Sequence, residues 1–187
     1  ITASAAPSAS PSASPKVSTP PSAAPSAAPS VKPSQQPQET AAPEISQKPA
    51  ALVFTWPVNG AIIASFSVET LLYDETMLDW RTHEGIDLAA EEGTRVLAVA
   101  AGTVSQVYED DLMGVTVVID HGDGLESVYS NLAQAPDVAE GDSVYTGDII
   151  GVVGNTAPAE SGRAAHLHFA MYRDGEPVDP EEYLPDY

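Results

Sequence analysis

Two short stretches of the chain combine histidine and aspartate at spacings that suit a metal ion. In "HEGID", His83 and Asp87 are four residues apart, and in "HLH", His166 and His168 are two apart. An even separation places both side chains on one face of an extended strand. Gly85, within the first pair, leaves room for another group to approach. Imidazole nitrogens and carboxylate oxygens are ordinary zinc ligands.

These four donors match the needs of a catalytic zinc site. Such a site has three protein ligands and a water in the fourth position, because the open position holds the nucleophile. Three of the four side chains can therefore bind the metal while the fourth acts on the bound water. Spacing alone leaves a second interpretation open, in which these residues are surface or structural histidines.

Other reactive side chains are scarce. The chain has no cysteine, which excludes disulfides, thiolate zinc ligands and cysteine nucleophiles. His121 lies in "IDHGDG" at a predicted turn, and we expect a structural role for it.

The elements that position these residues are predicted to be short strands. Segments rich in Val and Ile alternate with turn signals such as "HGDG", "EGD" and "TGD". The expected strands are 62–66, 96–100, 103–108, 115–120, 126–129, 149–153 and 166–172. Residues 69–78, "ETLLYDETML", are expected to form a helical turn or a long loop. The similar segments "EGTRVLAVAAGTV" and "EGDSVYTGDIIGVV" indicate two related hairpin units. We therefore predict a mostly antiparallel β domain over residues 51–187.

Residues 1–50 differ in composition from the rest. They consist largely of Ala, Ser and Pro, with few large apolar side chains that could offset the entropy of ordering. Frequent proline also blocks helix and central strand. We expect a disordered, extended tether. Because the chain starts at Ile1 and holds no apolar run of membrane-spanning length, we expect the anchor of this tether to lie upstream.

The charge restricts the possible partners. The formal net charge is −20, and residues 51–187 hold four arginines, no lysine and 25 acidic side chains. Such a surface repels nucleic acid and anionic lipid, so we expect neither as a partner. A cationic partner suits it better, and the plainer explanation is that the acidic side chains keep the domain soluble.

Four segments together resemble the M23 (lysostaphin/LytM-type) metallopeptidases. They are "HEGIDLAAEEGTRVLAVAAGTV", "VVIDHGDGLESVYSNL", "GDSVYTGDIIGVVGNT" and "HLHF", in this order. The resemblance implies a β-sheet domain of the duplicated hybrid motif type with a zinc-bearing groove, which cuts peptide cross-bridges of bacterial peptidoglycan. It also implies that His83, Asp87 and His168 bind Zn²⁺ and that His166 is the general base toward the bound water.

A narrower resemblance involves the residues just before "HEGID". "FTWPVNG", "SVETLLYDETMLDWRTHEGID" and "YSNL" are similar to the stage II sporulation protein Q branch of the family. That branch implies an extracytoplasmic, membrane-anchored domain in the space between mother cell and forespore. There it engages a partner protein from the opposite membrane.

One departure from the family pattern affects catalysis. Where M23 peptidases carry a second catalytic histidine in "Y-x-H", this chain has Asn131 in "ESVYSNL". An amide donates a hydrogen bond but cannot carry a proton, and losing such a group costs on the order of 10²–10⁴ in rate. In addition, Ala170 follows "HLHF" where an acid is common. The preceding loop, "NTAPAESGRAA", brings Arg163 near the groove, either to contact an acidic ligand or partner or as a solvated loop charge.

The sequence thus predicts a zinc-binding domain with impaired hydrolysis that docks peptidoglycan peptides or a sporulation partner protein. The alternative is an active peptidoglycan endopeptidase. A lipoyl or biotin carrier, suggested by "GDSVYTGDIIGVV", requires a lysine that residues 51–187 do not contain. A sugar phosphocarrier with paired histidines does not suit a domain behind a Pro/Ala/Ser tether.

Overall fold

The computed structural model describes residues 52–74 and 76–186. The predicted tether over residues 1–50 lies outside this part of the chain. The described residues form β-strands connected by turns, with two single-turn 3₁₀ helices, η1 (Pro158–Glu160) and η2 (Pro180–Glu182). Among them, no helix is long and apolar enough to cross a membrane. The mostly antiparallel β architecture is therefore confirmed.

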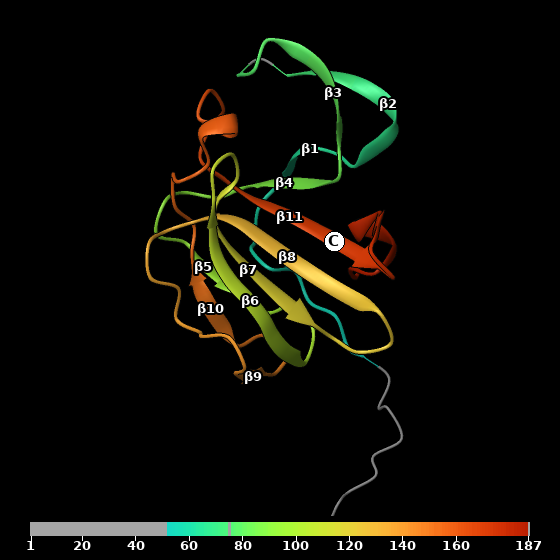
Figure 1. Cartoon of the computed structure of the whole chain (residues 1–187), viewed down its shortest axis with the longest axis vertical. Coiled ribbons are helices and arrows are strands. Elements are labelled where there is room, and N and C mark those ends of the chain that lie inside the picture. The colour runs from blue at the N-terminus through green and yellow to red at the C-terminus, as the bar shows by residue number, and fades with distance from the viewer. Residues whose placement is uncertain (1–51, 75, 187) are drawn as a thin grey trace, which may run out of the picture. The chain divides into compact units, whose positions relative to one another are not determined.

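Eight strands form one antiparallel sheet at the centre of the domain (Figure 1). Its order is β1 (Ile62–Ala64), β4 (Gly85–Ala89), β11 (His166–Arg173), β8 (Leu125–Leu132), β7 (Gly114–Asp120), β6 (Gly102–Asp110) and β9 (Ser143–Val144), with β12 (Glu176–Val178) paired to β11. The predicted strands 62–66, 103–108, 115–120, 126–129 and 166–172 all correspond to members of this sheet.

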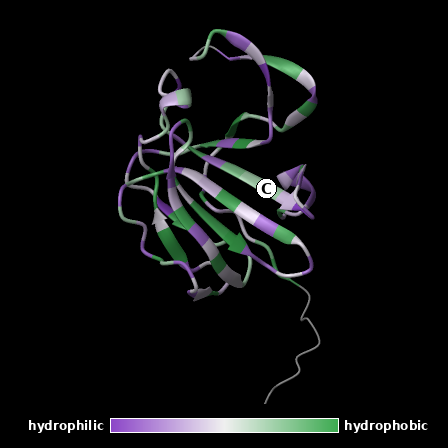
Figure 2. Cartoon of the chain, in the orientation of Figure 1, coloured by the Kyte–Doolittle hydropathy of each residue, from purple (hydrophilic) through white to green (hydrophobic). Residues whose placement is uncertain are grey.

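A second pair of strands completes the core. β5 (Arg95–Leu97) and β10 (Ile149–Val152) form their own small sheet. Their side chains, including Val96 and Ile150, join the same buried cluster as Phe169 and Ile119 of the main sheet. Figure 2 shows hydrophobic residues along the strands of both sheets. Burial of these Val, Ile and Leu side chains supplies most of the favourable free energy of folding.

The two similar sequence segments form related structures, but the predicted hairpin units are wrong. The strands of each segment pair with strands of the other segment, β5 with β10 and β6 with β9. The backbone bonds beside these pairs also correspond, with distances of 2.8 Å in both halves. They are Gly93 N–H to Val153 O and Val153 N–H to Thr94 O in one half, and Gly141 N–H to Val104 O and Val104 N–H to Asp142 O in the other.

The segment before "HEGID" is a β-hairpin, so the expected helical turn or long loop is wrong. β2 (Ser67–Asp74) pairs with β3 (Asp79–His83) and the hairpin extends away from the main sheet (Figure 1). Asp74 Oδ1 accepts the backbone N–H groups of Thr76 and Met77 and thereby fixes the turn. Most side chains of β2 are exposed on both faces. The polar and apolar residues therefore do not alternate as they do in a half-buried strand.

Candidate metal centre

Neighbouring strands β4 and β11 bring Asp87 and His168 together. Asp87 lies directly opposite His168 in the antiparallel register, and Asp87 Oδ1 is 2.9 Å from His168 Nδ1. The Asp87 side chain is 0% exposed. Gly85 allows this pairing, since a Cβ there would lie 2.5 Å from the carbonyl oxygen of Phe169 in β11. The room that the sequence predicted at Gly85 is therefore taken by the neighbouring strand.

His83 reaches the same point from the end of the hairpin. Its Nε2 is 3.2 Å from Asp87 Oδ1 and 3.3 Å from His168 Nδ1. Its Nδ1 lies 3.0 Å from the carbonyl oxygen of Ser65, which can only accept a hydrogen bond. The proton is therefore on Nδ1, and the lone pair of Nε2 faces the two other donors, as metal-binding histidines require.

The separations among these three donors fit a zinc ion. Tetrahedral zinc with bonds of about 2.0–2.1 Å places neighbouring ligand atoms about 3.3 Å apart. The three separations are 2.9, 3.2 and 3.3 Å. The structure thus brings together the three predicted ligands at the spacing that this metal needs.

A fourth group, Glu160, joins the cluster and was not predicted. Its Oε1 is 3.2 Å from His168 Nδ1, and its Oε2 is 2.9 Å from His166 Nε2. One donor atom each from His83, Asp87, Glu160 and His168 lie within 4.8 Å of one another. Glu160 ends η1 in the loop before β11. The only signal in the sequence is that it is the one acidic residue in "NTAPAESGRAA".

His166 lies beside this cluster, on the same side of β11 as His168. Its ring is buried, its Nδ1–H donates to the carbonyl oxygen of Ala164 at 2.7 Å, and its Nε2 faces Glu160. Its Nε2 is 3.9 Å from Asp87 Oδ2. The spacing argument for one shared face is confirmed. The role of general base stays a prediction, because Glu160 occupies the nitrogen that would face a bound water.

The side-chain hydrogen bonds of Asn131 all go to backbone groups. The side chain is buried at the end of β8, with a left-handed backbone at φ 61° that asparagine tolerates. Its Nδ2 donates to the carbonyl oxygen of His166 at 3.0 Å. Its Oδ1 accepts the N–H groups of Thr156 and Ala157 at 2.9 and 3.1 Å. The amide therefore binds the backbone of β11 and of the loop that carries Glu160.

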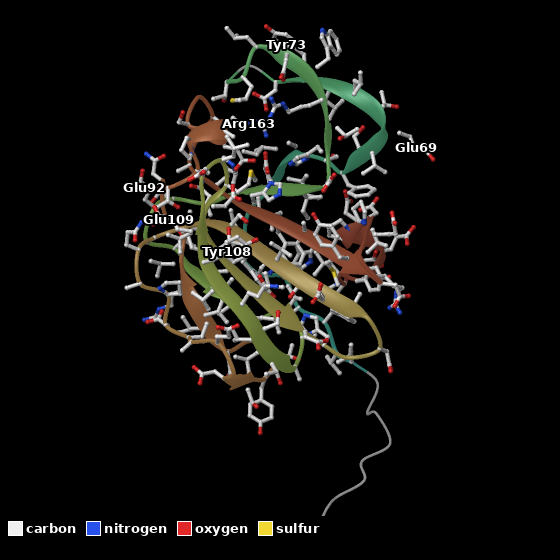
Figure 3. The ribbon with its side chains drawn as sticks, in the orientation of Figure 1. Glu69, Tyr73, Glu92, Tyr108, Glu109 and Arg163 are labelled. Atoms are coloured by element: carbon white, nitrogen blue, oxygen red, sulfur yellow. The ribbon has the colours of Figure 1, made fainter. Side chains whose placement is uncertain are left out.

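Arg163 is not a solvated loop charge, and that expectation is wrong. Its guanidinium contacts the carboxylate of Asp87, and its Nη2 is 3.1 Å from Asp74 Oδ2 at the end of β2. Arg163, labelled in Figure 3, thus connects the loop after η1 with β4 and the hairpin. Asp74 and Asp87 are buried carboxylates, and a buried charge needs a partner of opposite sign. This explains why the guanidinium of Arg163 points toward them and not into solvent.

The charges within the cluster shift its protonation equilibria. Burial opposes the imidazolium of His168, but hydrogen bonds to Asp87 and Glu160 outweigh it and raise the pKa to about 9. Burial likewise opposes the charged form of Glu160, yet hydrogen bonds from His166 and His168 lower its pKa to about 2. The pKa of Asp87 falls and that of His166 rises for the same reasons. Buried carboxylates therefore attract positive charge here.

A cavity of about 240 Å³ opens beside the cluster. The hairpin forms one wall with Leu72, Tyr73 and Arg81, while Met113 and Tyr172 belong to the main sheet and its loops. His83, Glu160, Arg163 and His168 line it as well. The cavity gives a ligand access to the donors.

His121 has the structural role that the sequence predicted. Its Nδ1–H donates to the carbonyl oxygen of Ala101 at 2.9 Å, and its Nε2 is 2.7 Å from Ser127 Oγ. Burial lowers its pKa, so the ring is neutral at neutral pH. It takes no part in the metal-ligand cluster.

The fold and the cluster define a class, namely an antiparallel β domain with a His/Asp/Glu cluster that could hold a metal ion beside a cavity. Residues 81–180 match the model of Peptidase family M23, and the chain belongs to that family. It is 41% identical over 103 residues to the DD-carboxypeptidase/endopeptidase Mpg of Neisseria meningitidis serogroup B, covering 54% of this chain and 22% of that protein.

Similarity to a sporulation protein extends further along the chain. The stage II sporulation protein Q of Bacillus subtilis is 29% identical over 150 residues, covering 79% of this chain and 51% of that protein. A solved structure of the SpoIIQ–SpoIIIAH pore forming complex contains a chain with a TM-score of 0.62 and 27% identity, covering 72% of this chain and 92% of that one. The chain thus spans about a fifth to a half of the length of these two curated relatives.

Proposed function

We propose that this M23 domain binds zinc and docks a peptide or protein at the bacterial cell wall, with weak or no hydrolysis. The observation that carries this proposal is the environment of Asn131, whose amide makes three hydrogen bonds to backbone groups. It stands where the family's peptidases place a second catalytic imidazole, so the chain lacks the proton carrier at that position.

Zinc is supported by the donor set and its spacing. Two imidazoles and a carboxylate at 2.9–3.3 Å match three corners of a zinc tetrahedron. A bound zinc ion supplies Lewis acidity and links the strands that carry its ligands. The residues of this chain orient those ligands, since Ser65 fixes the ring of His83 and Arg163 contacts Asp87.

Docking is supported by the hairpin beside the cavity. Figure 2 shows hydrophobic residues on β2, and the hairpin exposes several large apolar side chains. They are Val68, Leu71, Leu72, Tyr73, Met77, Leu78 and Trp80. Exposed apolar clusters of this kind are typical of interaction sites. The similarity to stage II sporulation protein Q, and to a chain solved in the SpoIIQ–SpoIIIAH pore forming complex, suggests a sporulation protein as the partner.

This proposal includes a location. The domain would act outside the cytoplasm, held by a membrane anchor upstream of the Ala/Ser/Pro-rich residues 1–50. In a sporulating cell that location is the space between forespore and mother cell, which the similarity to stage II sporulation protein Q favours.

A wall-digestion assay tests the loss of hydrolysis. Zinc-loaded protein is incubated with purified peptidoglycan, and new amino termini are counted beside an active M23 peptidase as the positive control. We expect release at least about 10²-fold slower than the control. Release as fast as the control would overturn the proposal. The alternative is then an active endopeptidase, which the three candidate ligands and His166 favour.

A pull-down from a lysate of sporulating cells tests the docking role. The captured proteins are identified as membrane-anchored or not. Trp80→Ser removes a side chain that is 66% exposed on the hairpin and should reduce capture. Tyr145→Ser, 74% exposed in the β9–β10 turn, is the matched control and should leave capture unchanged. Equal capture by both variants would contradict docking through the hairpin.

A further inference from the structure

A carboxylate occupies the region where a hydrolytic zinc site would admit water. Glu160 is buried, and its Oε1 lies 3.2 Å from His168 Nδ1 and within 4.8 Å of the donor atoms of His83 and Asp87. We propose that Glu160 is a fourth protein ligand, which closes the coordination sphere of the metal. This rests on the metal site proposed above and specifies what fills its last position.

Distance supports this assignment first. The separation between Glu160 Oε1 and His168 Nδ1 falls within the 2.9–3.3 Å range of the three predicted ligands. It is also near the roughly 3.3 Å edge of a zinc tetrahedron. Four-ligand spheres without an open position are the arrangement of structural zinc sites, whereas catalytic sites keep one position free.

Charge supports it next. The side chains of Asp74, Asp87 and Glu160 are at most 7% exposed, and Arg163 is the only arginine or lysine paired with them in the described chain. Both ring nitrogens of His166 face oxygen acceptors, so this ring adds one positive charge. With His83 and His168 neutral, three carboxylates, one guanidinium and the His166 imidazolium sum to −1, and a divalent cation bound to Asp87 and Glu160 offsets this negative charge. Because unpaired buried charge is strongly unfavourable, the metal and Glu160 satisfy each other.

The loop that carries Glu160 is fixed on both sides. The N–H of Ala159 donates to the carbonyl oxygen of Leu112 at 3.0 Å, and the N–H of Gly162 donates to Thr76 Oγ1 of the hairpin turn at 3.3 Å. Within the loop, the N–H of Arg163 donates to the carbonyl oxygen of Glu160 at 3.0 Å. The carboxylate is therefore held at the cluster by the backbone around it.

Asn131 fixes the start of the same loop. Its Oδ1 accepts the N–H groups of Thr156 and Ala157, which lie four and three residues before Glu160. The residue that replaces the second imidazole thus acts as a positioning residue for Glu160. Asn131 therefore has two effects. It removes a proton carrier from the family pattern, and it helps to orient the carboxylate of Glu160.

Cobalt substitution tests the assignment without relying on activity. Protein loaded with Co²⁺ is titrated with acetohydroxamate, a small metal-chelating anion, while its visible absorption is recorded. Wild-type protein should show no change, because four protein ligands leave no open position. Glu160→Ala should show a new spectrum, and its affinity for Zn²⁺ should fall at least about tenfold. Glu182→Ala, exposed in η2, is the matched control and should behave as wild type.

The variants separate the two proposals. If wild type binds neither ion, or if His168→Ala binds as tightly as wild type, the metal site itself is wrong. If His168→Ala loses the metal but wild type responds to acetohydroxamate as Glu160→Ala does, only the role of Glu160 is wrong. Should Glu160→Ala fail to fold, the wild-type titration still decides. Glu160→Gln, of nearly the same shape, then provides the comparison.

Discussion

His168 is the candidate ligand that contacts two buried carboxylates. It lies opposite Asp87 and also contacts Glu160, so two carboxylates stabilise its imidazolium in the metal-free protein. A metal needs the neutral imidazole, so proton and metal compete for one nitrogen. The same carboxylates that attract the proton also attract a cation, which is why the pKa of His168 bears directly on metal affinity.

Metal affinity should therefore rise with pH. The pKa of His168 is about 9, so at pH 7 the metal-free ring is protonated and binding must release that proton. We expect the apparent association constant for Zn²⁺ to increase about tenfold per pH unit between pH 7 and 8.5, and to level off above pH 9. Competition with a chromophoric chelator of known pH dependence measures this. An association constant that is flat over that range would show that metal binding releases no proton from His168.

Asn131 should also be important for stability. Asn131→Ala leaves two N–H groups and one carbonyl without their partner, and we expect a loss of about 1–3 kcal/mol in the free energy of unfolding. Asn155→Ala, exposed in the following loop, should change it by less than about 0.5 kcal/mol. Urea unfolding of both metal-free variants measures the difference. Equal stabilities would mean that the amide is not needed to hold the loop.

Strands with a buried face were predictable, whereas the hairpin and the loop were not. β7 and β11 are runs of apolar residues between turn signals, and their boundaries were correct to within one residue. β2 has most of its side chains in solvent and so carries no alternating pattern. Glu160 is placed by loop bonds to Asn131, Leu112 and Thr76, which are distant in the sequence, so local spacing could not reveal it.

A buried hydroxyl network links β8 to the turns around it. Tyr129 is fully buried, its Oη accepts the N–H of Val99 at 2.9 Å, and it lies 3.0 Å from Ser127 Oγ. Ser127 in turn contacts His121, which bonds the carbonyl oxygen of Ala101. The backbone at Val99 and Ala101 is thereby connected to β8. None of these buried side-chain polar atoms is left without a partner.

Removing that hydroxyl should weaken the fold. Tyr129→Phe leaves the N–H of Val99 without an acceptor, and we expect a loss of about 1–3 kcal/mol. Tyr145→Phe removes the same atom from an exposed ring and should have almost no effect. Chemical denaturation with intrinsic fluorescence measures both. If Tyr129→Phe were as stable as wild type, another group would have to satisfy that N–H.

The described domain combines a large excess of acidic residues with a cluster that needs positive charge. Residues 51–187 hold 25 acidic side chains and four arginines, and one of these arginines, Arg163, already lies within the cluster. The field of the whole molecule therefore favours a divalent cation at the site. The candidate ligands come from β3, β4, β11 and the loop of η1, so one ion would join segments that are far apart in the chain.

Metal binding should for this reason raise the thermal midpoint of the whole domain. An ion that binds only the folded state adds about 4 kcal/mol at a free concentration of 1,000 times Kd, which for a domain of this size corresponds to about 8–16 °C. Differential scanning calorimetry with zinc and with excess chelator measures the shift. His168→Ala should have one midpoint in both conditions, because a ligand is gone while the strand remains. If the wild-type midpoint were indifferent to chelator, the four donors would be held together by their own hydrogen bonds and ion pairs alone.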